Sequence, residues 1–202
     1  SIFDGTGVFL GKWGTPGSAP GEIDGPCGLV FDDDDNLYIT DHRNNRIQKF
    51  TVDGRFLSSF GTEGSGDGQF NLPWGLTVAP NGNVYVADWR NDRIQRFTSD
   101  GEFIASHGTA GDGDGEFNRP SSVAVDEDGY IYVADFGNER VQVLDPDGGF
   151  VMKLRGEATM SKWADEFSEA NADEAAARAR SNITPPLDPE VDTATRSRHG
   201  SS

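Results

Sequence analysis

Apolar and polar residues alternate in short runs along much of this chain, and alternation with a period of two predicts β-strands. The four clearest runs cover residues 75–79, 83–87, 93–97 and 102–106. The pairs Asn81-Gly82 and Asp100-Gly101 separate the first run from the second and the third from the fourth. Because both pairs tolerate the positive φ of tight turns, we predict two hairpins and four short antiparallel strands.

The four-strand pattern recurs with a period of 47 residues. The motif Asp-X-X-Asn-X-Arg begins at Asp41, Asp88 and Asp135, and residues 21–67, 68–114 and 115–161 align without insertion, with ten identical columns. Four antiparallel strands in a unit of about 40–50 residues are typical of a propeller blade. The sequence therefore predicts an all-β propeller with blades at residues 21–67, 68–114 and 115–156.

The polar residues of the recurring motif are predicted to be structural. An Asp–Arg pair, with the Asn amide closing the turn backbone, would fix the corner between the second and third strands. A set that recurs in every copy indicates architecture, whereas a catalytic site would occur once. The residues concerned are Asp41, Asn44, Arg46, Asp88, Asn91, Arg93, Asp135, Asn138 and Arg140.

A longer string around this motif resembles the NHL repeat. Pro-X-Gly-Leu is followed by Asn-X-Tyr and then by Asp-X-X-Asn-X-Arg-Ile-Gln-X-Phe in residues 26–50 and again in residues 73–97. The third copy departs mildly, with Ser122 for the glycine and Leu144 for the final phenylalanine. The resemblance covers residues 1 to about 156 and implies an NHL-type β-propeller, a fold that hosts both binding proteins and enzymes.

The first residues match the end of a repeat and not its beginning, because Phe3 and Phe9 lie one period before Phe50 and Phe56. Residues 1–20 are therefore predicted to be a partial blade, which gives an arc of about three and a half four-stranded blades. Such an arc does not close a ring, so we expect the chain to be part of a larger propeller. By itself it should either aggregate or pair with a second copy, with residues 2–13 and the third blade near the contact.

The repeat pattern stops near residue 156. Residues 160–180 are rich in Ala, Glu and Arg, which favours a helix, and Trp163 and Phe167 form a narrow apolar stripe on it. The remainder, to residue 202, is polar and is predicted to be a disordered tail. Two interpretations of residues 157–202 stay open: the helix docks on a blade face, or the segment is a linker inserted between two halves of a longer protein.

Charge argues against a nucleic-acid partner. The chain contains 34 acidic and 17 basic residues, for a net charge of −17, whereas binding to phosphates needs clustered Lys and Arg. Only Arg43, Arg90 and Arg119 are candidates for a basic loop face. No run of about 18 apolar residues predicts a membrane span. The single Cys27 excludes an internal disulfide, and the sequence does not distinguish a cytoplasmic from a secreted protein.

No cofactor and no catalytic residues are predicted. The three histidines, His42, His107 and His199, occupy unrelated positions in the repeat. Carboxylates at alternating positions of one glycine-rich loop are candidates for Ca²⁺ ligands, although a flexible, solvated loop is the preferred interpretation. These candidates are Asp112, Asp114 and Glu116.

The loops between the second and third strands and those entering the first strand are expected to share one face of the blades. Exposed aromatic and Arg side chains on such a face are typical anchors for a protein or peptide, although the rings could instead pack between blades. The leading hypothesis is a non-catalytic recognition scaffold. The alternative is a metal-dependent propeller enzyme, similar to the amidating lyases or lactonases, whose ligands lie partly on missing blades. The predicted binding face contains His42, Arg43, Trp74, Trp89, Arg90 and Phe136.

Overall fold

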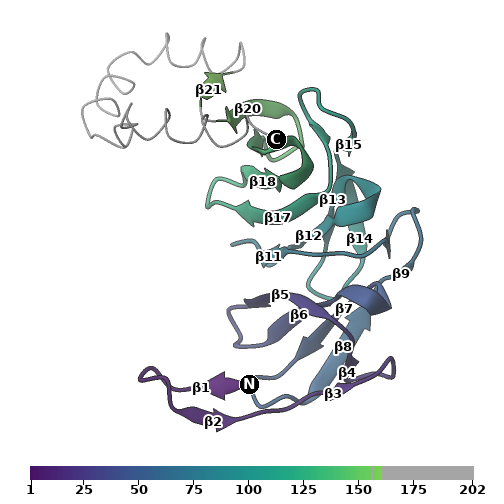
Figure 1. Cartoon of the computed structure of the whole chain (residues 1–202), viewed down its shortest axis with the longest axis vertical. Helices are drawn as coiled ribbons and strands as arrows, with labels where there is room; N and C mark the ends of the chain where they lie inside the picture. The colour runs from purple at the N-terminus through teal and green to yellow at the C-terminus, as the bar shows by residue number, and fades with distance from the viewer. Residues whose placement is uncertain (156, 161–202) are drawn as a thin grey trace, which may run out of the picture. The chain divides into compact units, whose positions relative to one another are not determined.

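Three β-sheets of four or five strands follow one another along the chain, and each begins with four consecutive antiparallel strands (Figure 1). The structure is a computed structural model that describes residues 1–155 and 157–160. The described residues all belong to one compact unit, residues 1–161. The all-β propeller prediction is confirmed by this arrangement, while the helix and tail predicted after residue 160 lie outside the described residues.

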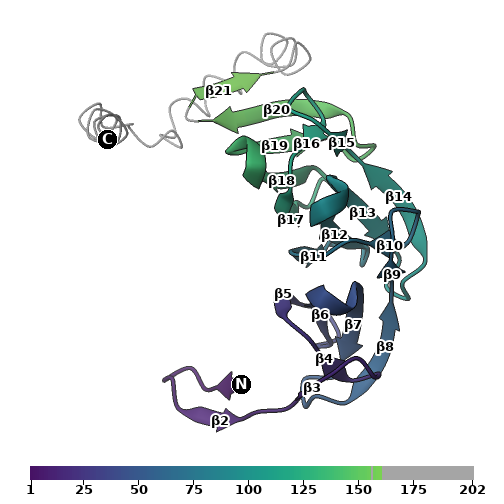
Figure 2. The ribbon, with the colours of Figure 1, turned by 45° about the vertical axis from the view of Figure 1, so that its right-hand side comes forward.

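Each sheet is one blade, and consecutive strands are neighbours in it (Figure 2). Blade 1 consists of β5 (Pro26–Phe31), β6 (Leu37–Asp41), η1 (His42–Asn44), β7 (Arg46–Phe50) and β8 (Phe56–Phe60). Blade 2 consists of β11 (Leu76–Val78), β12 (Val84–Asp88), η2 (Trp89–Asn91), β13 (Arg93–Phe97) and β14 (Phe103–His107). Blade 3 consists of β17 (Pro120–Val125), β18 (Ile131–Asp135), η3 (Phe136–Asn138), β19 (Arg140–Leu144), β20 (Phe150–Arg155) and β21 (Glu157–Met160).

The hydrophobic core lies between the blades. Because successive side chains of a strand point to opposite faces, each blade can bury one face against the blade before it and the other against the blade after it. Tyr38 and Ile47 of blade 1 pack with Val84 and Phe97 of blade 2. Blades 2 and 3 form an equivalent core. Each such side chain contributes about 1.5–3 kcal/mol on burial, so the contacts between blades are the main stabilising interactions.

The innermost strands approach each other so closely that glycine is required. The backbone N–H of Gly75 donates a hydrogen bond of 3.1 Å to the carbonyl of Ser121 in the next blade. A Cβ on Gly75 would lie 2.6 Å from that carbonyl oxygen, and a Cβ on Gly28 would lie 2.7 Å from the carbonyl oxygen of Trp74. In blade 3 the equivalent position is Ser122.

The glycine-rich loops between blades are more ordered than the sequence predicted. In the loop before blade 2, β9 (Thr62–Glu63) pairs in parallel with β10 (Gln69–Phe70). The other two loops contain the same pairing, of β3 (Thr15–Pro16) with β4 (Glu22–Ile23) and of β15 (Thr109–Ala110) with β16 (Glu116–Phe117). Phe70 and Phe117 are fully buried. The expectation of flexible, solvated loops is therefore wrong for their ends, which are held by strand pairing and by a buried ring.

The two end faces of the described array are incompletely covered. Before blade 1, β1 (Ile2–Phe3) and β2 (Phe9–Gly11) form one antiparallel pair, and Trp13 stacks on Phe50 at 5.0 Å. Leu29 on the innermost strand is 63% exposed, whereas the equivalent Leu76 is 8% exposed. At the other end, Tyr132 is 38% exposed where the equivalent tyrosines of blades 1 and 2 are buried.

Blade 3 differs from the others in its last strand. After β20 the chain pairs antiparallel with it as β21, which makes a five-stranded sheet. In the earlier copies the equivalent of Arg155 is a glycine of positive φ, such as Gly108, from which the chain crosses to the next blade. The only helices in the described part are three-residue turns, and none is long or apolar enough to cross a membrane.

Candidate functional site

The carboxylate of Asp41 is the centre of the corner between β6 and β7. It is fully buried and accepts hydrogen bonds from Arg46 Nε at 2.7 Å, Asn44 Nδ2 at 2.9 Å and Gln48 Nε2 at 2.9 Å. Its second oxygen accepts a bond of 2.7 Å from the backbone N–H of Asp24. A buried carboxylate needs such a set of charge-assisted partners, because its desolvation is otherwise unfavourable.

The same side chains hold the loop that arrives from the preceding blade. Arg46 donates to the backbone carbonyls of Ser18 and Glu22, both at 2.8 Å. Asn44 Nδ2 donates to the carbonyl of Gly17 at 2.9 Å. The prediction that this amide closes the backbone of its own turn is wrong, since its backbone partner lies 27 residues earlier in the chain.

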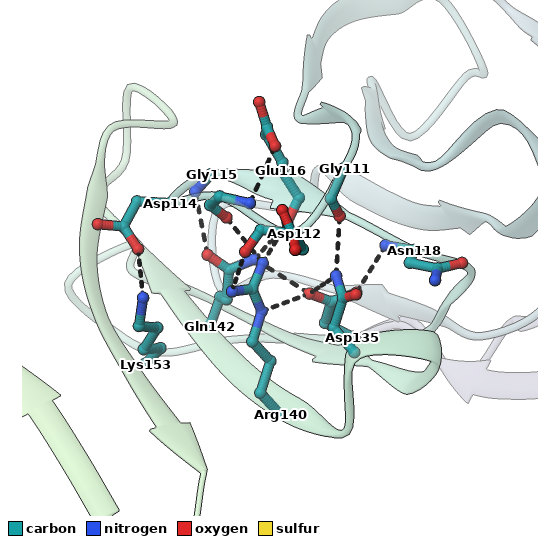
Figure 3. Close-up of polar contacts among 12 residues, drawn as sticks. Gly111, Asp112, Asp114, Gly115, Glu116, Asn118, Asp135, Arg140, Gln142 and Lys153 are labelled. Carbon is teal, nitrogen blue, oxygen red and sulfur yellow. Dashed lines mark hydrogen bonds and ion pairs between the residues drawn. The ribbon is translucent and has the colours of Figure 1, made fainter.

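The third copy repeats this network around Asp135 (Figure 3). Arg140 donates to Asp135 at 2.7 Å and to the carbonyls of Asp112 and Glu116 at 2.7 and 2.8 Å, and Asn138 donates to the carbonyl of Gly111 at 2.8 Å. In the second copy, desolvation raises the pKa of Asp88 above its ordinary value, although bonds from its partners act in the opposite direction. Three equivalent networks indicate a structural element.

The calcium candidates do not converge on one point. Asp114 forms an ion pair of 2.8 Å with Lys153 (Figure 3). Glu116 Oε2 accepts a bond of 2.9 Å from the backbone N–H of Gly113. Asp112 and Asp92 line an open cavity of about 350 Å³. Within residues 1–155 and 157–160, no group of three or more His, Cys, Asp or Glu side chains is arranged to hold a metal ion.

Four residues of the predicted binding face are brought together on the loop side of blades 1 and 2. The His42 ring contacts the Trp74 ring edge to face at 5.7 Å, and Trp74 contacts Trp89 in the same way at 5.3 Å. Arg90, the fourth, lies over Trp89. His42 Nδ1 is 3.0 Å from the carbonyl oxygen of Pro73, which fixes the imidazole across the junction. Trp74, at the centre of the row, is 40% exposed.

Two arginines flank the last ring of this row. The guanidinium carbon of Arg90 lies 5.5 Å from the Trp89 ring centroid, and that of Arg119 lies 5.2 Å from it. The backbone N–H of Arg119 donates to Asp92 Oδ1 at 2.7 Å, which ties the loop entering blade 3 to blade 2. We call His42, Trp74, Trp89, Arg90 and Arg119 the aromatic strip.

Two of the predicted residues lie beside the strip. Arg43 forms an exposed ion pair of 3.2 Å with Asp24. Phe136 lies at the equivalent turn of blade 3, is 67% exposed, and makes no ring contact with the other predicted residues in the described part. Cys27, close to Arg43, has its thiol pKa raised by burial, which disfavours a reactive thiolate at neutral pH.

Arg119 was predicted as a candidate for a basic loop face but not as a residue of the aromatic binding face, and its guanidinium lies against Trp89. One signal could have identified it, namely its position directly before the fixed Pro120, in the loop that enters the first strand. The equivalent residue in the second copy, Leu72, cannot provide a charge. The partner of Arg119 is one blade away, so the contact itself could not be read from the sequence.

A family model described as the NHL repeat matches residues 24–50, 70–97 and 117–144. No curated protein matches this sequence. Among solved structures, a streptogramin B lyase aligns with a TM-score of 0.53 at 20% identity, covering 68% of this chain and 42% of that one. Virginiamycin B lyase from Staphylococcus aureus aligns with a TM-score of 0.52 at 19% identity, covering 65% and 41%.

Hydrazine synthase from Kuenenia stuttgartiensis aligns with a TM-score of 0.53 at 17% identity, covering 68% of this chain and 38% of that one. This chain therefore spans about two fifths of the length of each of these structures. At such identities the likeness shows a common fold alone, and the names, which include two lyases and a synthase, agree with that.

Proposed function

Because this chain belongs to the NHL repeat family and carries an aromatic strip on the loop side of its blades, we propose that it is a non-catalytic recognition module. Its partner is a protein or peptide that binds along the strip. The observation that carries the proposal is the row of three rings from two blades, with Trp74 half-exposed at its centre. Trp and Arg side chains are the residue types most often found as anchors of binding energy in interfaces.

The packing of the strip supports binding without a large entropic cost. His42 and Trp89 fix Trp74 from both sides, so the exposed edge of the indole needs little further ordering when a partner arrives. The propeller framework holds both neighbours through its blade cores. A rigid aromatic surface of this kind suits a peptide or loop that adapts its own side chains to the row.

Trp74→Ala tests the proposal. Peptides would be selected from a random library on the immobilised full chain, and the best binder measured in solution by fluorescence anisotropy. Loss of an aromatic anchor costs about 2 kcal/mol or more, so the variant should bind roughly 30-fold more weakly. Ile104→Ala is the matched control, because Ile104 is 37% exposed on β14, away from the loop side.

Two outcomes would contradict the proposal. The first is that no peptide binds in a manner that depends on Trp74, or that Ile104→Ala weakens binding as much as Trp74→Ala does. The second is a stoichiometric, tightly held Ca²⁺ or Zn²⁺ in the purified chain, which would favour the alternative of a metal-dependent lyase or hydrolase. Elemental analysis of the same preparation provides this second measurement.

A further inference from the structure

We propose, resting on the proposed function, that the aromatic strip recognises an acidic peptide, whose carboxylates pair with Arg90 and Arg119. The two guanidinium groups lie on the same indole, at 5.5 and 5.2 Å from its centroid. Both charges are therefore carried at the Trp89 end of the strip, where carboxylates of a partner can pair with them. The two arginines of the strip would therefore determine where the charged residues of a partner bind.

The basic side chains of residues 1–154 fall into two groups. Six of them form an ion pair with a carboxylate within 3.2 Å, and five do not. These paired cations are Arg43, Arg46, Lys49, Arg93, Arg140 and Lys153. Arg90 and Arg119 form no such pair in the described part, although the chain as a whole has twice as many acidic as basic residues. Among the basic side chains without an ion pair in residues 1–154, only Arg90 and Arg119 lie against the same ring, so these two are the candidates for binding an external anion.

Both arginines are also preorganised. Contact with Trp89 restricts each guanidinium, whose N–H groups have no hydrogen-bond acceptor in the described part, and the backbone of Arg119 is fixed by its bond to Asp92. The planar guanidinium matches a carboxylate with two parallel hydrogen bonds, which makes Arg more selective than Lys for this group. The carboxylates closest to Arg90 and Arg119 along the chain are Asp88, Asp92 and Glu116.

The net charge of −17 does not prevent this binding. At physiological salt, charges separated by more than about 8 Å are largely screened, so distant acidic residues act only weakly on a peptide bound at the two arginines. The fixed carboxylates of the corners, Asp41, Asp88 and Asp135, are each neutralised by their own arginine. The other acidic side chains of the surface repel an acidic peptide. They should therefore limit binding to peptides whose acidic residues lie at the strip.

The anion proposal is tested with the peptide obtained by selection against the full chain. Its Asp and Glu residues would be replaced by Asn and Gln, and both peptides measured against wild type, Arg90→Gln and Arg119→Gln. We expect the acidic peptide to bind wild type roughly tenfold more tightly than its amide form, and each Arg variant to remove most of that difference. Raising the salt from about 0.05 M to about 0.3 M should weaken only the acidic peptide.

Arg55→Gln is the matched control. Arg55 is exposed and lies in the turn between β7 and β8, at the opposite end of the blade from the 3₁₀ turns, so its loss should leave both affinities unchanged. Trp74-dependent binding by peptides that are neutral or basic would overturn the anion proposal and leave the recognition module standing. Absence of any Trp74-dependent peptide would overturn both. Stronger competition by a single-stranded oligouridine than by the acidic peptide would overturn the peptide class in favour of RNA.

Discussion

His107 occupies a position at which Trp13 and Phe60 stand in the earlier copies. Each of these rings covers a hairpin glycine of the following copy, and a Cβ on Gly148 would overlap the imidazole of His107. The imidazole is almost fully buried, and its Nε2 has no hydrogen-bond partner among the described residues. Desolvation and the nearby Arg96 lower the pKa of His107, while Asp145 and Asp147 act in the opposite direction. A titratable group therefore stands inside the junction of blades 2 and 3.

This arrangement predicts a stability that falls in mild acid. The pKa of His107 is lower in the folded than in the unfolded chain, so below about pH 6.5 the unfolded chain takes up a proton that the folded chain does not. Stability should be lost from about pH 6.5 down to the lowered pKa. His107→Phe should weaken this pH dependence and, by removing an unsatisfied buried nitrogen, raise the Tm at neutral pH by about 2–4 °C.

Thermal unfolding between pH 5 and pH 8, followed by circular dichroism, measures the His107 effect. Phe60→His is the matched variant, because it places the same group in the junction of blades 1 and 2 and should introduce an acid-sensitive loss of stability there. Equal pH profiles for wild type and His107→Phe would show that the imidazole is not the responsible group.

At the scale of elements, the packing of one blade on the next depends on the innermost strands. Gly28 and Gly75 have no side chain, so the backbone of the following blade can approach the first strand of their own blade closely. Gly75 also donates a hydrogen bond across this junction. The aromatic strip lies on the same strand-entry segments, since Trp74 directly precedes Gly75. The spacing of the blades and the geometry of the strip are therefore determined together.

Gly75→Ala should destabilise the protein by about 1–3 kcal/mol, because its Cβ would lie 2.6 Å from a backbone oxygen that cannot move without the whole strand. Denaturant unfolding measures this change. Gly11→Ala serves as the control, since no atom lies within 4 Å of the Cβ that it would add. A neutral Gly75→Ala would mean that the junction is looser than the structure indicates.

The sequence predicted these elements well where the information is local. Alternation placed β12 and β13 within a residue of their observed bounds, and Asn-Gly and Asp-Gly marked the hairpins. The 3₁₀ turns were predicted only as corners, because their left-handed final residues include Glu139, which has no intrinsic preference for that conformation. Neither the loop partners of Asn44 nor the contact of Arg119 with Trp89 could be predicted, since both depend on how distant segments meet.

At the scale of the whole molecule, blade 3 departs from the repeat at two positions where the earlier copies meet the next blade or cross to it. Ser122 stands where Gly28 and Gly75 admit the next backbone, and Arg155 stands where Gly14, Gly61 and Gly108 start the crossing to the next blade. The sheet is extended by β21 instead. Pairing with a second copy, as expected from the sequence, stays a prediction. In that pairing, Ser122 is the residue whose side chain would most directly hinder the close approach of the second copy.

Ser122→Gly should strengthen self-association of the full chain, because it removes the side chain that would meet the innermost strand of an incoming blade 1. We expect the dimer Kd to fall by roughly tenfold, as measured by light scattering over a range of concentrations. Ser121→Gly is the control in the same strand, one residue from the approach position. A wild-type dimer whose Kd is insensitive to Ser122→Gly would show that two copies meet by a different contact.

The corner networks also bear on how such a chain can change its length during evolution. Their hydrogen bonds reach back at most 28 residues, as from Arg46 to Ser18 and from Arg140 to Asp112, which is well within one period. Duplicating or deleting one 47-residue unit would therefore leave every corner with its own loop and its own carboxylate. The number of repeats can therefore change during evolution without disturbing the hydrogen bonds of the corners. Selection on the number of repeats would act through the end faces, where Leu29 and Ser122 lie.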